Sequence, residues 1–564
     1  MKLKNIIYTM LGAAALFSSC SDSFLDEKMY SKYGTNVTDV NSKCVGLYYK
    51  YGHIWGWEGR QGFVGIWQDG TDVGSPGDTE GVEVPFYKYA ELNSENGGVS
   101  FLWESLYSMI DAANQIINTE NTETKYVAEA KFFRAYAYNM LVNLWGAVPL
   151  VTESTTTPRT DYTRTAVEEV DKLIESDLTD AMTNLPSVSD REKAGLPDRV
   201  TKDAARMLAS EAFLRMGMRD NSYFAKAGQA VSPVIEEGNY QLISQRYGAF
   251  VSEPGDYYHD MFRWGNQRRT QGNTEGIWTY QMEYNRDVPG GTIHNPQQRR
   301  NWVPAFHKIS GMVNADSIGG RGNGRLRLSN YVKYGLFQEG DIRNSNFNIK
   351  RTIYYNKPGF SADIWVDSEG FRVAEGTAGA QKKHVQTGDK VYWQRGDTLA
   401  VMYPHPTKWG AYDTSDDFGY AMVKDWPVMR LAEAYLLRAE ARLRQNDKEG
   451  AATDINVLRD RAFKDYRLSS GNAEAGKVSA ADMDIDFILD ERIRELVSEE
   501  NRRMTLVRTG KLAERWEKYH DRGDKVPENK LSSGFDAKKH TLLPIPLTEI
   551  QLNKDANLEQ NPGY

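Results

Sequence analysis

The stretch 128–146, AEAKFFRAYAYNMLVNLWG, decides the fold class of this chain. Its apolar residues recur every three or four positions, which is the spacing of one face of an α-helix. The residues of this stripe are Ala130, Phe133, Ala137, Met140 and Leu144. Gly146 and Pro149 follow it and are typical of a helix end. The stretch therefore predicts a long helix with one buried face.

The same helical spacing of apolar residues occurs in segments before and after this helix. Runs with helical apolar spacing cover residues 101–118, 165–182, 201–217, 223–238, 428–445, 452–463 and 485–512. Large and small apolar residues alternate on these paired helices, as in tetratricopeptide-type hairpins, in which small residues let neighbouring helices pack closely. We therefore expect a mainly α fold, a scaffold of tetratricopeptide-like helical hairpins built by residues 20–245 and 421–564.

Residues 246–420 differ and are predicted to form a long loop-rich insert. They are rich in Gly, Asn, Arg and Tyr, with short β-like runs at 276–284, 351–356 and 390–393. The part 261–360 holds 15 Lys and Arg against 6 Asp and Glu. Two interpretations stay open: a solvated basic face or partner contact, and a site for an acidic ligand.

The N-terminus predicts export and a lipid anchor. Two lysines, an apolar run from Ile6 to Phe17 and two serines precede Cys20. The run is too short to span a bilayer, so residues 1–19 are interpreted as a signal peptide of the lipoprotein type, cleaved before Cys20. Cys20 is the expected lipidation site, and several acyl chains make a durable membrane anchor.

Composition and motifs argue against several function classes. The chain carries 69 Lys and Arg against 77 Asp and Glu, a net charge of −8, which disfavours nucleic-acid binding as its main task. The known catalytic, nucleotide-binding and metal-ligand motifs are not found, so no cofactor and no metal are expected. A glycoside hydrolase stays open, because its two carboxylates meet only in space.

Several segments together resemble one family. They are SFLDEK after Cys20, then Trp103, Tyr107, Ile110 and Asn114, AEAKFFRAYAYNMLVNLWGAVPL, RLAEAYLLRAEA with INVLRDRA, ERIRELVSEENRRMTLVRTGKL, and the tail LLPIPLTEIQLNKDANLEQNPGY. In this order they resemble the SusD/RagB family of outer-membrane nutrient-binding lipoproteins of Bacteroidetes. The resemblance covers nearly the whole mature chain.

The resemblance implies a cell-surface, lipid-anchored protein of the outer membrane without catalytic activity. It implies binding of a polysaccharide or oligosaccharide, or of a peptide as in RagB-type proteins. It also implies a partner, a TonB-dependent SusC-type barrel on which the protein acts as a hinged lid. The resemblance places scaffold roles, rather than ligand contacts, on Arg134, Trp145, Arg430, Glu433 and Arg503.

Candidate ligand residues are sought in the loops, because long loops on a rigid scaffold usually carry function. A sugar ring offers one apolar face and a rim of hydroxyls, so its site combines aromatic rings with Asp, Asn or Arg side chains. The segment 53–89 and the segments 263–269 and 292–302 have this composition. The candidates are Trp55, Trp57, Trp67, Asp69, Asp72 and Tyr87, and Trp264, His294, Asn295, Arg300 and Trp302. We expect the Trp67 and Trp302 rings to be mostly exposed.

Overall fold

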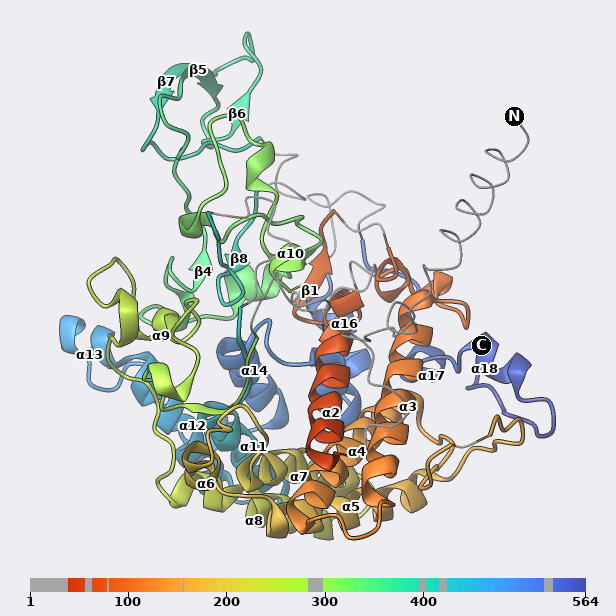
Figure 1. The fold of residues 1–564 in the computed structure, drawn as a ribbon. Helices are drawn as coiled ribbons and strands as arrows, with labels where there is room; N and C mark the ends of the chain where they lie inside the picture. Colours follow the sequence, from red (N-terminus) through yellow and green to blue (C-terminus); the bar gives the residue numbers. More distant parts are fainter. Residues whose placement is uncertain are drawn as a thin grey trace, which may run out of the picture.

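A helical array forms the base of the molecule, and loops and short strands lie above it (Figure 1). The computed structural model describes residues 39–55, 63–78, 81–155, 157–282, 298–394, 402–414, 424–521 and 531–564. The longer helices are α2 (Val40–Trp55), α3 (Gly97–Ile117), α4 (Thr124–Trp145), α5 (Val167–Asn184), α7 (Lys202–Gly217), α8 (Ser222–Glu236), α11 (Leu431–Arg444), α12 (Lys448–Ala462) and α14 (Ile485–Leu496). The mainly α fold and the helix predicted at 128–146 are confirmed.

Neighbouring helices pack in chain order, as helical hairpins do. α3 packs on α4, α4 on α5, α7 on α8 and α11 on α12. α8 also packs on α11, so the helices before and after the loop-rich part form one continuous array. Small residues allow the close approach: a Cβ on Gly217 would lie 2.4 Å from the ring of Phe224, so any larger residue would push α8 away from α7.

Short helices complete the scaffold and the loops. They are α6 (Val188–Lys193), α9 (Tyr257–Asp260), α10 (Gln298–Trp302), α13 (Lys464–Ser470), α15 (Arg502–Arg508), α16 (Leu512–Tyr519), α17 (Ala537–His540) and α18 (Leu547–Leu552). In the part of the chain that the structure describes, no helix combines the length and the apolar character needed to cross a bilayer.

The strands are short and pair across long stretches of sequence. They are β1 (Gly74–Pro76), β2 (Gly276–Tyr280), β3 (Leu326–Leu328), β4 (Ile349–Lys350), β5 (Ser361–Val366), β6 (Arg372–Val373), β7 (Gln381–Gln386), β8 (His405–Pro406) and β9 (Trp426–Arg430). β1 pairs with β3, β2 with β9 and β4 with β8, and β5 lies between β6 and β7, all antiparallel. β2 belongs to the insert, and β9 ends at Arg430, directly before α11. Their pairing therefore attaches the insert to the start of α11.

The predicted strands are only partly found. The run 276–284 contains β2, but the runs 351–356 and 390–393 contribute a single bridge, Tyr354 to Lys390. The three-stranded sheet of β5, β6 and β7 was not predicted. Only one face of this sheet is buried, against the core around Ile364, Val366 and Val385. The other face is polar, so the strands lack the runs of apolar residues by which strands were sought in the sequence.

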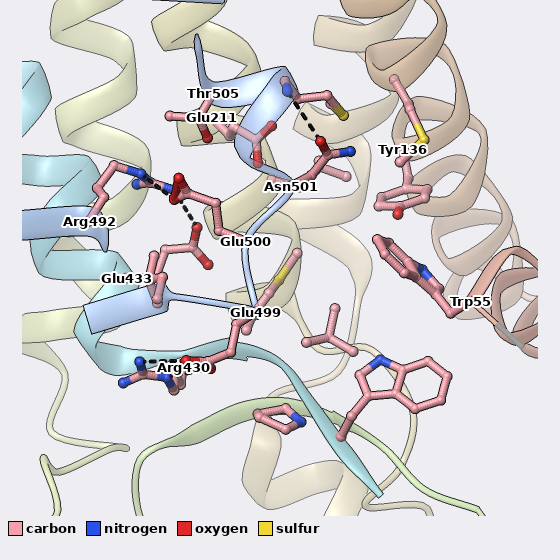
Figure 2. Close-up of a pocket in the computed structure, with 18 of the residues that line it drawn as sticks. Trp55, Tyr136, Glu211, Arg430, Glu433, Arg492, Glu499, Glu500, Asn501 and Thr505 are labelled. Atoms are coloured by element: carbon pink, nitrogen blue, oxygen red, sulfur yellow. Dashed lines mark hydrogen bonds and ion pairs between the residues drawn. The ribbon is translucent and has the colours of Figure 1, made fainter. Parts of the chain in front are cut away.

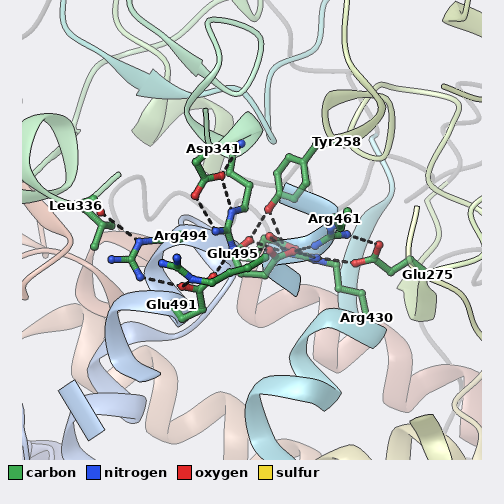
Figure 3. Close-up of polar contacts among 12 residues, drawn as sticks. Tyr258, Glu275, Leu336, Asp341, Arg430, Arg461, Glu491, Arg494 and Glu495 are labelled. Atoms are coloured by element: carbon green, nitrogen blue, oxygen red, sulfur yellow. Dashed lines mark hydrogen bonds and ion pairs between the residues drawn. The ribbon is translucent and has the colours of Figure 1, made fainter. Parts of the chain in front are cut away.

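A buried ion-pair network fastens the insert to the C-terminal helices (Figure 3). Glu495 on α14 lies at its centre and is fully buried. Its carboxylate accepts from Arg430 at 2.6 Å, from Arg343 at 3.1 Å and from Arg461. Arg343 belongs to the insert, while Arg430 precedes α11 and Arg461 is on α12. Glu275, Asp341, Glu491 and Tyr258 complete the network.

Buried ion pairs account for part of the excess positive charge of the insert. Arg325 pairs with Glu83 at 2.6 Å, Arg327 with Asp521 at 3.7 Å, and Arg343 with Asp341 and Glu491. All three arginines are buried. Three of the 15 basic residues of 261–360 are therefore paired inside the protein and are not exposed to an acidic ligand.

The helical run 485–512 is interrupted between α14 and α15. Ser498 adopts a left-handed φ of 67°, and Asn501 caps α15 by accepting from the backbone N–H of Met504 at 3.2 Å. The interruption turns residues 497–501 toward the interior. It places Glu499, Glu500 and Asn501 in the wall of a cavity.

Candidate functional site

A cavity of about 120 Å³ lies where the helical array meets the loops (Figure 2). This volume is roughly ten times the space that one water molecule needs. Its walls come from α2, α4, α7, α11, α14 and α15, from β9 and from the first residue of α10, Gln298. Both the scaffold and the insert contribute to it.

One side of the cavity is aromatic. Tyr51 and Trp55 come from α2, Tyr136 from α4, Trp426 from β9, and Trp409 from the insert. The ring centroid of Tyr51 lies 6.4 Å from that of Trp55, 5.5 Å from that of Tyr136 and 6.4 Å from that of Trp426. These rings offer apolar faces to a ligand.

The opposite side is charged, and Figure 2 shows Arg492, Glu433 and Glu500 across from Trp55 and Tyr136. Arg492 donates to Glu433 at 3.0 Å and to Glu500 at 2.7 Å. Its Nη1 has no hydrogen-bond partner among the described residues, although the side chain is only 2% exposed. A buried donor without a partner costs free energy unless a water or ligand oxygen accepts from it.

Two carboxylates on this side are available to a ligand. Burial raises the pKa of Glu433 to about 7, and the nearby Glu211 and Glu500 raise it as well, against the attraction of Arg492. A raised pKa makes the protonated, hydrogen-bond-donating form of Glu433 accessible at a higher pH than for an ordinary glutamate. Glu211, on α7, makes no ion pair or hydrogen bond with any residue that the structure describes.

The cavity thus combines what recognition of a polyol requires. Aromatic faces on one side suit the apolar C–H face of a ring, while Arg492, Asn501, Glu211 and Glu433 offer donors and acceptors to hydroxyls. Asn501 Nδ2 also lacks a partner in the described residues. No group of three or more His, Cys, Asp or Glu side chains suited to a metal ion occurs among them.

Two of the three predicted ligand segments, 53–89 and the described part of 292–302, lie close together. Trp55 lines the cavity, and its ring lies 5.7 Å from that of Trp67. α10, which ends at Trp302, packs against the short 3₁₀ helix η2 (Phe63–Trp67). Gln298 at the start of α10 lines the cavity, whereas Trp302 does not.

The exposure expected for the rings of Trp67 and Trp302 is wrong. Trp67 and Trp302 are each 1% exposed. Asp69, Asp72, Tyr87 and Arg300 are buried too. The physical reason is a clamp from the C-terminal helices: Arg502 binds both carboxylate oxygens of Asp72, at 2.8 and 2.7 Å, and Arg503 donates to the carbonyl of Ile66 at 2.9 Å.

The other candidates lie elsewhere. Trp264 is 37% exposed and does not line the cavity. Trp57, His294, Asn295 and Cys20 lie outside the described residues. The scaffold roles expected from the resemblance agree with the contacts: Arg134 pairs with Asp177 at 2.8 Å, and the buried Trp145 donates to the carbonyl of Pro544 at 2.8 Å.

The sequence predictions missed most of the polar residues of the cavity. Glu211, Arg492 and Asn501 were not singled out, while Glu433 was expected to be an ion-pair residue of the scaffold, with which its contact to Arg492 at 3.0 Å agrees. One signal was present for Glu211, because it interrupts an otherwise almost wholly apolar and buried stretch of α7. A carboxylate at such a position needs a partner or access to solvent.

Comparison with known proteins assigns the family. The SusD family model matches residues 274–564, and a model described as "Starch-binding associating with outer membrane" matches residues 77–214. The chain belongs to the SusD family, and the resemblance found in the sequence is confirmed.

Similar proteins include SusD-like protein P25 of Formosa agariphila, 25% identical over 589 residues and covering 98% of this chain and 97% of that protein. Starch-binding protein SusD of Bacteroides thetaiotaomicron is 35% identical over 141 residues, 25% of this chain and 22% of that protein. Among solved structures, a SusD homolog from Bacteroides thetaiotaomicron has a TM-score of 0.66 at 20% identity, covering 96% of this chain and 100% of that chain. A laminarin binding SusD-like protein has a TM-score of 0.62 at 22% identity, covering 93% and 99%. These two structures support the fold.

Proposed function

We propose that this protein captures a glycan at the cell surface and binds one of its sugar rings in the cavity between Trp55 and the pair Arg492–Glu433. The observation that carries the proposal is the cavity itself, with aromatic rings on one side and donors and acceptors without partners on the other. The names of the relatives support a glycan, since one is a starch-binding and another a laminarin binding protein. Such a protein binds its ligand without changing it.

The first prediction tests the cavity. Trp55→Ala removes an aromatic face and should weaken glycan binding by about 1 to 3 kcal/mol, as truncation of a binding hot spot does. Glu211 makes no ion pair or hydrogen bond with the residues that the structure describes, so Glu211→Gln breaks no such contact. It should weaken binding as well, because one of the two carboxylate oxygens that accept from ligand hydroxyls becomes an NH₂ donor. The measurement is affinity gel electrophoresis of the purified protein in starch, laminarin and other soluble polysaccharides.

Tyr334→Ala serves as the matched control, since this aromatic side chain is 74% exposed and does not line the cavity. It should migrate like the unaltered protein in every gel. If both cavity variants bind the glycan as tightly as the unaltered protein, the cavity is not the glycan-binding site. Binding of a peptide library instead of any polysaccharide would favour the RagB-type alternative.

We further propose that Cys20 carries the lipid anchor and that the protein sits as a lid on a SusC-type barrel of the outer membrane. Family membership and the N-terminal sequence support this. Tethering beside the barrel would raise the effective concentration of the two partners for each other.

The second prediction tests anchor and lid together. From gently solubilised outer membranes the unaltered protein should purify with a large β-barrel, whereas Cys20→Ala should leave the membrane fraction of cells that lack this barrel. Circular dichroism should show the same helical content for both proteins. A Cys20→Ala protein that stays with barrel-free membranes would contradict the anchor, and a barrel-free monomer from native membranes would contradict the lid.

A further inference from the structure

The sheet of β5, β6 and β7 forms an arm that projects away from the helical base (Figure 1). One face of β5 packs on a small core through Ile364 and Val366, which are 2% and 8% exposed. Trp365 points to the opposite face, because side chains alternate along a strand. Its cross-strand neighbours are Val373 on β6 and Lys382 on β7.

Trp365 has no evident role in the core. It is half-buried, and it belongs to none of the hydrophobic clusters that the described residues form. A large aromatic residue outside a core contributes little to stability, since much of its ring stays in water. Its position on an exposed arm therefore points to a contact with something outside the chain.

Trp365 lies in a depression of about 590 Å³, a size within the range of small-ligand pockets. Asp363, Arg372, Glu375 and Thr377 also line it. The carboxylate of Asp363 contacts Lys382 at 2.9 Å and His384 at 2.8 Å, and all three side chains are accessible to solvent and so to a ligand. A carboxylate, a guanidinium and a hydroxyl beside an aromatic ring offer both donors and acceptors to a ligand.

We propose that this depression is a second carbohydrate subsite, in which Trp365 stacks on a sugar ring and Asp363 and Arg372 bind its hydroxyls. The proposal rests on the proposed function and adds to it a subsite on a different element. The charges of the depression balance closely, with two carboxylates and one guanidinium beside Lys382 and His384. This balance suits a neutral sugar better than a uronate or sulfated one.

A protein partner fits this surface less well. The core of a protein interface is apolar and depleted in charged residues. Here the outer face around Trp365 carries Lys382, His384 and Asp363, and no residue of the three strands is among the exposed large hydrophobic residues. A single ring surrounded by hydrogen-bonding groups is the pattern expected for a sugar.

Two subsites on one molecule favour a polymer over a short fragment. Once one part of a polysaccharide is bound at the first subsite, binding of another part at the second subsite is intramolecular. The overall affinity then exceeds that of either subsite alone. A polysaccharide that reaches both the cavity and the arm gains from this effect. An oligosaccharide too short to reach both gains nothing.

The test compares Trp365→Ala, Trp365→Phe and the control Tyr334→Ala in affinity gels of starch, laminarin, xylan, mannan and polygalacturonate. For the polymer that retards the unaltered protein most, Trp365→Ala should weaken binding roughly tenfold, Trp365→Phe should restore most of it, and Tyr334→Ala should have no effect. Short oligosaccharides cut from that polymer should bind the cavity of the unaltered protein and of Trp365→Ala with equal affinity, because they cannot reach both subsites.

Equal retardation of Trp365→Ala and the unaltered protein would overturn the second subsite and leave the proposed function standing. Absence of retardation of the unaltered protein by every polymer would overturn both. If Trp365→Ala instead retains glycan binding but loses the barrel from solubilised membranes, the arm is a protein contact and the proposal is wrong. Circular dichroism and denaturant midpoints of each variant show whether the arm still folds.

Discussion

Replacing Glu495 by glutamine is expected to lower the free energy of unfolding by about 3 to 5 kcal/mol, because it removes one charge from a buried network and leaves three arginines without their shared partner. Arg343, Arg430 and Arg461 all donate to this carboxylate. The amide nitrogen of glutamine would also face these donors. The measurement is the urea midpoint, with Glu449→Gln on the exposed face of α12 as the control.

The same variant should change the response to acid. Burial alone would raise the pKa of Glu495. The attraction of Arg461, Arg430 and Arg343 outweighs this effect, so the pKa lies well below its ordinary value. A depressed carboxyl pKa adds stability above the pKa of the unfolded chain, about 4.3, which is lost as the pH falls through the folded pKa. Glu495→Gln should therefore lose less stability between pH 5 and pH 2 than the unaltered protein. A midpoint and an acid profile equal to those of Glu449→Gln would contradict the role of the network.

Trp302→Ala is expected to lower the free energy of unfolding by about 3 to 5 kcal/mol, as loss of a core aromatic does. The ring is 1% exposed and belongs to the main hydrophobic core, although its sequence suggests an exposed loop residue. Tyr334→Ala, which truncates an exposed ring, should change stability by less than about 0.5 kcal/mol. Equal midpoints for the two variants would show that Trp302 is not a core residue in solution.

The helices could be predicted because their signal is local. The stripe in 128–146 predicts α4, and the run at 428–445 contains α11, since a buried helical face repeats every three to four residues. The resemblance implies that the helices before and after the insert form one scaffold, and the packing of α8 on α11 agrees with this. β2 lies in a predicted β-like run, but β1, β3 and β9 were not predicted, because strands of three to five residues carry almost no periodic signal.

The loops were misjudged for a different reason. Asp72 and Trp67 stand among glycines, as exposed ligand residues often do. Their burial depends on Arg502 and Arg503, and the contact between Asp72 and Arg502 spans 430 residues of sequence. The break between α14 and α15, which forms one wall of the cavity, depends on a left-handed residue at Ser498 that no helix-end signal marks.

The measurement that tests the central claim most directly is a crystal structure of the protein with the oligosaccharide that it binds best in the affinity gels. The proposed function predicts a sugar ring in the cavity, with one face against Trp55 and hydroxyls within hydrogen-bond distance of Arg492, Glu433 or Glu211. Sugar bound only elsewhere, with no ring between Trp55 and Arg492, would contradict it.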